Sequence, residues 1–180
     1  MTRWERYAYV PIVIFGLLLM IEPLILDENS PARCKGCHGD VVQPFAFSMT
    51  FRPIIEVKAG RPYADETLAR GLREEPSGSV LSKATNENRH AFHQDCGVRA
   101  LTLTAQLGLA DPGAQLSINF MPGIVYIPAA CIQRTLKTAR EAGFSIDRIV
   151  FEIAESEQVK DVGHLRPIVK DYRERRFLPE

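Results

Sequence analysis

Strand-like and helix-like segments alternate along the C-terminal part of the chain, and this alternation restricts the fold more than any other feature. Residues 115–121 and 147–153 have the apolar spacing of strands. Residues 128–143 and 161–176 have helical spacing, and Pro167 is expected to kink the second helix or delay its start. Strands that alternate with helices pair in parallel, with the helices packed outside the sheet.

This pattern predicts an α/β fold of the β/α barrel type. A closed barrel of eight units takes about 250 residues, and residues 45–180 supply about half of that. A hairpin is expected before the alternating part, with strands over residues 49–57 and 62–70 and a turn at residues 58–61. Residues 79–108 are expected to be helical. Asn86 or Asn88 could cap the helix that runs through Phe92, Cys96 and Ala100, and Gly108 has the place of a C-cap glycine.

The composition is that of an ordinary globular protein. The chain has 180 residues, of which 46% are hydrophobic and 24% charged, and its formal net charge is +0. A balanced charge gives no electrostatic basis for binding a DNA or RNA polymer, so we expect neither as a partner.

Residues 7–26 form an apolar stretch of about the length that spans a bilayer. We expect an apolar N-terminal helix over residues 1–26, which is either a membrane anchor, a buried helix or an extension upstream of the domain. Residues 27–44 are a polar linker, and residues 45–180 form the domain. The domain is expected in the cytoplasm, either tethered to the inner membrane through residues 7–26 or soluble.

Two linker cysteines, Cys34 and Cys37, have C-x-x-C spacing, which is used both in zinc sites and in redox pairs. Zinc needs about four ligands. Further ligands would have to come from the adjacent His38 or from the predicted helix, which carries His90, His93 and Cys96. The alternative is a pair of reduced linker thiols.

Polar residues occur at the ends of three predicted strands: Glu66, Asn119 and Glu152. The carboxyl ends of the strands form the catalytic face of a β/α barrel. Two carboxylates and an amide oxygen gathered there suit Mg²⁺ or Mn²⁺, and Arg70 could contact a phosphate oxygen. The alternative is a set of solvated residues at the rim of the sheet.

Three short motifs carry a resemblance to a known bacterial family. Glu66-Thr67-Leu68 looks like the Glu-Ala-Leu signature of the EAL domain, the cyclic di-GMP phosphodiesterase module. The segment from Asn119 to Pro122 looks like its Asn-x-x-Pro motif, and the segment from Phe151 to Glu155 looks like its Glu-x-Thr-Glu motif. The resemblance runs from about residue 45 to residue 177.

The resemblance implies a function in cyclic di-GMP signalling, where the family's reaction is metal-dependent hydrolysis of cyclic di-GMP to linear pGpG. It implies catalytic roles for Glu66 and Glu152, which would also bind the metal together with Asn119. It implies substrate contacts from Arg52, Leu68 and Arg70.

The chain also departs from the family pattern. Thr67 replaces the alanine of the signature, Ala154 replaces a threonine, and Arg52 stands where the family usually has a glutamine that touches guanine. The family continues into a strand with an Asp-Asp pair, then a lysine and a further glutamate or glutamine. We therefore expect a truncated EAL domain that does not hydrolyse the dinucleotide by itself. The alternatives are an inactive module that binds cyclic di-GMP, a homodimer or partner-binding module, and a gene fragment.

Overall fold

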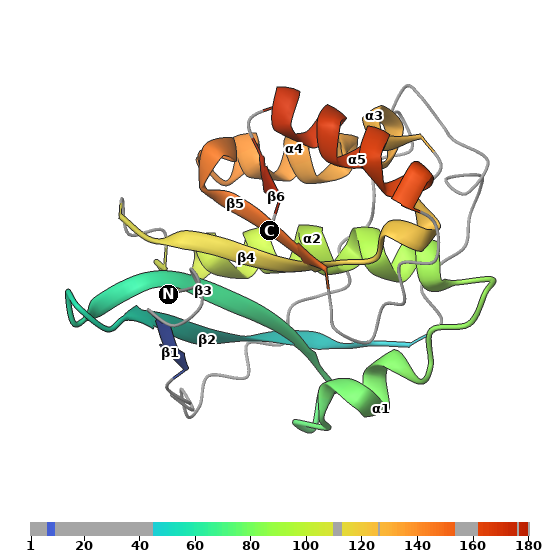
Figure 1. The fold of residues 1–180 in the computed structure, drawn as a ribbon. Coiled ribbons are helices and arrows are strands. Elements are labelled where there is room, and N and C mark those ends of the chain that lie inside the picture. The colour runs from blue at the N-terminus through green and yellow to red at the C-terminus, as the bar shows by residue number, and fades with distance from the viewer. Residues whose placement is uncertain are drawn as a thin grey trace.

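The structure is a computed structural model that describes residues 7–9, 45–109, 113–125, 127–153, 162–175 and 177–179. Six strands form one sheet in the order of the chain, β1-β2-β3-β4-β5-β6 (Figure 1). Their bounds are β1 Tyr7–Tyr9, β2 Ser48–Glu56, β3 Arg61–Arg70, β4 Gln115–Phe120, β5 Ile149–Ile153 and β6 Leu178–Pro179.

The predicted hairpin is confirmed: β2 and β3 pair antiparallel. Gly60 closes the turn with a positive φ of 63°, and its N–H donates to the carbonyl of Glu56 at 2.8 Å. The register shifts by one residue between Ile54 and Ile55. This β-bulge decides which residue of β3 lies opposite each residue of β2.

The predicted parallel part is also confirmed. The pairs β3–β4, β4–β5 and β5–β6 are all parallel, and helical segments connect them as in a β/α barrel. Figure 1 shows α2 behind β4, with α3, α4 and α5 above β5. β5 begins at Ile149 rather than residue 147, because a 3-10 turn, η4 Ile146–Arg148, precedes it.

The segment over residues 79–108, predicted to be helical, forms two helices, α1 Ser77–Leu81 and α2 Arg89–Gln106, and Asn88, one of the two predicted caps, is the N-cap residue of α2. Asn88 explains the break. Its Oδ1 accepts a bond from the N–H of Thr85 at 2.8 Å, and its Nδ2 donates to the carbonyl of Lys83 at 3.1 Å. These bonds replace helical ones. Gly108 follows α2 with a φ of 67°, as predicted for a C-cap glycine.

The remaining helices follow the prediction with small changes. The helix expected over residues 128–143 consists of α3 Pro128–Cys131 and α4 Gln133–Glu141, and a short 3-10 turn, η3 Pro122–Ile124, precedes them. The last helix, α5 Val162–Glu174, contains Pro167 in its interior, so this proline does not mark a late start.

The N-terminal helix predicted over residues 1–26 is wrong at residues 7–9, which form β1. This strand pairs antiparallel with Ile54, Ile55 and Glu56 of β2. The free edge of β2 offers backbone donors and acceptors that a short segment rich in tyrosine can satisfy as a strand. Residues 10–44, including Cys34 and Cys37, lie outside the described residues. None of the described helices is long and apolar enough to cross a membrane.

The sheet has two different faces. One face packs on the helices, and its central row is Phe51, Thr67, Ile118 and Phe151, all buried. Phe120, Phe151, Tyr172 and Phe177 extend this core with ring centroids 5.1–5.8 Å apart. Because side chains alternate along a strand, their neighbours in sequence point to the opposite face. This second face carries the predicted site.

Candidate functional site

The strand register places all of the predicted site residues of the sheet on this second face. Arg52 of β2 lies opposite Glu66 of β3, and Glu66 lies beside Ser117 of β4. Two residues further along, Asn119 of β4 lies beside Glu152 of β5. Neighbouring strands are about 4.8 Å apart, so the three predicted metal ligands occupy three adjacent strands within two residue rows.

Glu66 lies four residues before the end of its strand, in agreement with the strand predicted over residues 62–70. β3 runs on to Arg70, whereas its parallel pairing with β4 ends at Thr67. The last residues of β3 pair only with β2 among the described strands. Glu66 therefore stands at the carboxyl end of the parallel part of β3, and the strand extends beyond it towards α1.

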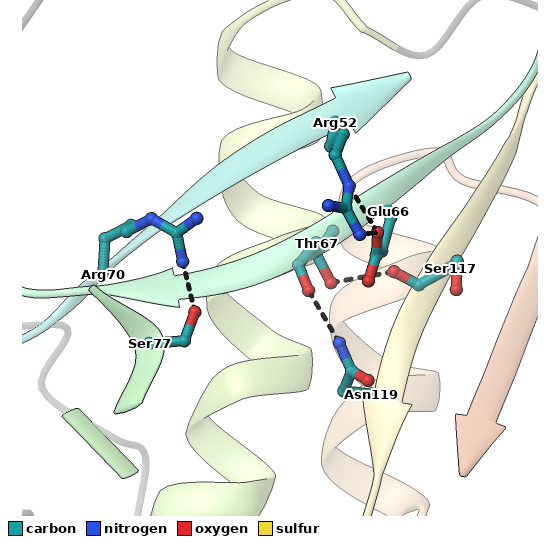
Figure 2. Close-up of polar contacts among 7 residues, drawn as sticks. All are labelled: Arg52, Glu66, Thr67, Arg70, Ser77, Ser117 and Asn119. Atoms are coloured by element: carbon teal, nitrogen blue, oxygen red, sulfur yellow. Dashed lines mark hydrogen bonds and ion pairs between the residues drawn. The ribbon is translucent and has the colours of Figure 1, made fainter. Parts of the chain in front are cut away.

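Arg52 holds the carboxylate of Glu66 (Figure 2). Nε of Arg52 donates to Oε2 of Glu66 at 2.8 Å, and the Nη2 group donates to the same oxygen. The side chain of Glu66 is 9% exposed and that of Arg52 is 38% exposed. A carboxylate this far removed from water needs a charged or hydrogen-bonding partner, and Arg52 provides it.

Two hydrogen bonds fix β3 to β4 at the level of the site (Figure 2). Oγ1 of Thr67 donates to the carbonyl of Ser117 at 2.9 Å, so the threonine in the signature is accommodated with its hydroxyl satisfied. Nδ2 of Asn119 donates to the carbonyl of Thr67 at 3.3 Å. This bond uses the amide nitrogen of Asn119. The amide oxygen Oδ1, which is the atom that would bind a metal, takes no part in it.

Arg70 ends β3 and is fixed at the start of α1. Its Nη1 donates to the carbonyl of Ala69 at 2.9 Å and also to Oγ of Ser77. Oγ of Ser77 in turn donates to the carbonyl of Ala69 at 2.8 Å. These contacts use one of the three guanidinium nitrogens, so Nε and Nη2 keep their donors for an anion.

The other two predicted residues share the face of Glu66. Leu68 is half-buried and lies between Glu66 and Arg70 along β3, opposite Thr50 of β2. Glu152 is half-buried near the carboxyl end of β5. A ligand that contacts both Arg70 and the acidic residues would therefore lie over Leu68.

The oxygen atoms on this face are chemically suited to a hard divalent cation. Carboxylate and amide oxygens are the ligands that Mg²⁺, Mn²⁺ and Ca²⁺ prefer. Among the residues that the structure describes, no group of three His, Cys, Asp or Glu side chains is arranged to hold a metal ion. A metal would therefore depend on the amide oxygen of Asn119, and Glu66 would have to release Arg52.

Two polar atoms of β4 were missed by the prediction. Oγ of Ser117 and Oε1 of Gln115 are buried and have no hydrogen-bond partner among the residues that the structure describes. Both residues alternate with core residues and therefore share the face of Asn119. The same alternation is visible in the sequence, so it could have identified both.

The zinc prediction finds no support among the described residues. Nε2 of His90 lies 3.5 Å from Sγ of Cys131, and the ring of His93 packs on Phe120 at 5.5 Å. Cys96 is a free, buried thiol whose pKa is raised by burial. These side chains pack around α2. The C-x-x-C pair lies outside the described part of the chain.

Comparison with known proteins identifies the fold. No family model matches the chain, and no curated protein matches it. Among solved structures, a standalone EAL protein from Vibrio cholerae O395, in its c-di-GMP-bound form, is 40% identical with a TM-score of 0.69. The match covers 76% of this chain and 56% of the Vibrio protein.

Two more distant structures share the fold. BlrP1 of Klebsiella pneumoniae, in a complex with manganese and cyclic di-GMP, is 19% identical with a TM-score of 0.70, covering 97% of this chain and 38% of its own. Two other BlrP1 structures, a calcium complex with cyclic di-GMP and a complex with FMN and cyclic di-GMP but no metal ions, are 21% and 20% identical, with TM-scores of 0.66 and 0.63. The PaMucR phosphodiesterase, bound to c-di-GMP, is 12% identical with a TM-score of 0.53, covering 71% and 54%.

The chain therefore spans about half the length of the EAL protein that it matches at 40% identity. The strand order, the parallel pairing after the first hairpin and the motif on β3 agree with this match. The described residues form part of a β/α barrel of the EAL type, as in these structures.

Proposed function

We propose that this chain acts in cyclic di-GMP signalling as an EAL domain that binds the cyclic dinucleotide. The observation that carries the proposal is the second face of the sheet. There Arg70 stands at one end, Glu66, Asn119 and Glu152 occupy adjacent strands further along, and Leu68 lies between them. A cyclic dinucleotide presents two phosphates and two flat bases, so it needs both cationic and apolar contacts.

Arg70 is the residue that we assign to a phosphate. Its guanidinium is held by Ser77 and Ala69 through Nη1, so little side-chain freedom is lost when a ligand binds. Its remaining donors can form charge-assisted hydrogen bonds to phosphate oxygens. The Vibrio protein was solved with c-di-GMP bound, which supports the choice of ligand.

Hydrolysis of cyclic di-GMP is the second candidate function, because the oxygens of Glu66, Asn119 and Glu152 suit Mg²⁺ or Mn²⁺. Such a metal would supply Lewis acidity and an activated water for attack on phosphorus. The resemblance attributes further ligands to a part of the domain that this chain does not span. We therefore propose nucleotide binding for the described part of the chain, and the phosphodiesterase reaction for a domain that also carries those further ligands.

The cellular location is part of the same proposal. Cys96 is a free thiol, which fits a reducing compartment. We assign the domain to the cytoplasm on this basis.

Calorimetric titration with cyclic di-GMP in buffer with a chelator tests the proposal, and the chelator separates nucleotide binding from metal binding. The unmodified chain should bind at micromolar concentration, and Arg70→Ala should weaken binding at least about tenfold through the loss of charge-assisted bonds. Arg73→Ala is the matched control, because Arg73 is 91% exposed and pairs only with Glu75 among its described contacts. Absence of heat at high micromolar ligand, or equal losses in both variants, would refute the proposal.

A further inference from the structure

The Arg52–Glu66 pair places a fixed cation on the carboxylate that the proposed metal site needs. We propose that Arg52 competes with the divalent metal for Glu66, so that metal affinity at this site is restrained by a residue of the chain itself. This inference rests on the proposed function, since it concerns the metal that the proposed site would hold.

The pair follows from the backbone and not from a chance side-chain orientation. Near the turn, Ile55 lies opposite Pro62, and continuing that register would set Arg52 opposite Asp65. The β-bulge shifts the register, so Ile54 lies opposite Ala64 and Arg52 opposite Glu66. Residues directly opposite each other on one face of a sheet are in contact distance. The bulge therefore directs the guanidinium to this carboxylate.

The contact geometry explains why a metal would have to displace Arg52. Nε and Nη2 of Arg52 both donate to one oxygen, Oε2 of Glu66. A cation bound to that oxygen would lie where the guanidinium lies, and the two positive charges would repel each other. The remaining oxygen of Glu66 could bind a metal only with Arg52 still close by.

The burial of the two side chains indicates that this competition is effective. Glu66 is 9% exposed, so water cannot replace a lost partner, whereas Arg52 is 38% exposed. Breaking an ion pair whose carboxylate is largely shielded from water costs more free energy than breaking a surface pair. Arg52 should therefore stabilise the folded chain without metal and lower its affinity for metal, two effects of opposite sign.

The test is a titration of the full chain with Mn²⁺, without nucleotide, followed by electron paramagnetic resonance of the free ion. Arg52→Gln removes the charge and keeps a polar side chain of similar reach. We expect Mn²⁺ to bind about tenfold more tightly to this variant, the equivalent of one ion pair of moderate strength. Its melting temperature should fall by a few degrees without metal and recover when Mn²⁺ is added.

Two further variants make the result specific. Arg73→Gln removes an exposed arginine of the same charge and should leave Mn²⁺ affinity unchanged. Arg52→Lys keeps the charge but loses the paired donors, and it should tighten binding about twofold to fivefold. If Arg52→Gln does not fold, the lysine variant alone decides.

An Arg52→Gln chain that binds Mn²⁺ no more tightly than the unmodified chain would overturn the inference. Tighter binding that survives the additional change Glu66→Gln would also overturn it, because the metal would then lie elsewhere. Neither result depends on cyclic di-GMP, whose binding is measured separately with a chelator, so this inference and the proposed function can fail independently.

Discussion

Acid should destabilise this domain well above the pH at which an ordinary carboxylate is protonated, because the half-buried His93 of α2 resists protonation. Burial, and to a lesser extent the nearby His90, lower the pKa of His93 from 6.5 to about 4. Its ring packs on Phe120 at a centroid distance of 5.5 Å. The folded state therefore holds the neutral imidazole, whereas the unfolded chain binds a proton below pH 6.5.

The size of the effect follows from proton linkage. The folded pKa is depressed, so the unfolded state binds more protons between pH 6.5 and 4, and stability falls as the pH is lowered through that window. Within that window, each pH unit lowers the free energy of unfolding by about 1.36 kcal/mol. Lowering the pH from 7 to 5 should reduce the free energy of unfolding by about 2 kcal/mol.

Urea unfolding at pH 7 and pH 5 measures this loss. His93→Phe keeps an aromatic ring against Phe120 without a titrating group, so its stability should change by less than about 0.5 kcal/mol over the same range. His164→Gln is the control, because His164 contacts the carbonyl of Pro122 in another part of the chain, and it should lose stability as the unmodified chain does. Equal pH dependence in the unmodified chain and in His93→Phe would refute the reasoning.

Two further predictions concern packing. Ser117→Ala removes a buried hydroxyl that has no hydrogen-bond partner in the described part of the chain and should raise the free energy of unfolding by about 1 kcal/mol, measured by urea unfolding; a loss of stability would mean that the hydroxyl has a partner. Gly97→Val should lower stability by about 2 kcal/mol, because a Cβ at Gly97 would lie 3.0 Å from Oγ1 of Thr135. In contrast, a Cβ at Gly78 meets no atom within 4 Å, so Gly78→Ala should raise the melting temperature through helix propensity. If both glycine variants behave alike, α2 and α4 are not as close as the distance between Gly97 and Thr135 implies.

The sequence was sufficient to predict the elements whose signals are local. The strands β4 and β5 and the glycine after α2 were predicted from signals within single segments, and the structure confirms them. Asn86 and Asn88 were both candidate caps of α2. Helical spacing could not decide between them, because the start at Asn88 depends on the hydrogen bonds that its side chain forms with Thr85 and Lys83. β1 was missed because its partner, Ile54–Glu56, lies more than forty residues away.

The same distinction holds for the candidate site. Period-2 spacing assigns Ser117 and Asn119 to one face of β4, and parallel pairing then brings Glu152 beside Asn119. The contact between Arg52 and Glu66 could not be derived in this way. It depends on a one-residue register shift inside the hairpin, and neither turn composition nor strand spacing reveals a bulge.

The central claim is that the face of the sheet carrying Glu66, Asn119 and Glu152 binds a cyclic dinucleotide and a divalent ion. The most direct measurement is anomalous diffraction from crystals of the chain grown with Mn²⁺ and cyclic di-GMP. We predict a manganese peak in contact with oxygens of these three residues and a ligand phosphate at Arg70. Dinucleotide bound away from this face, or manganese found only at other side chains, would contradict the account.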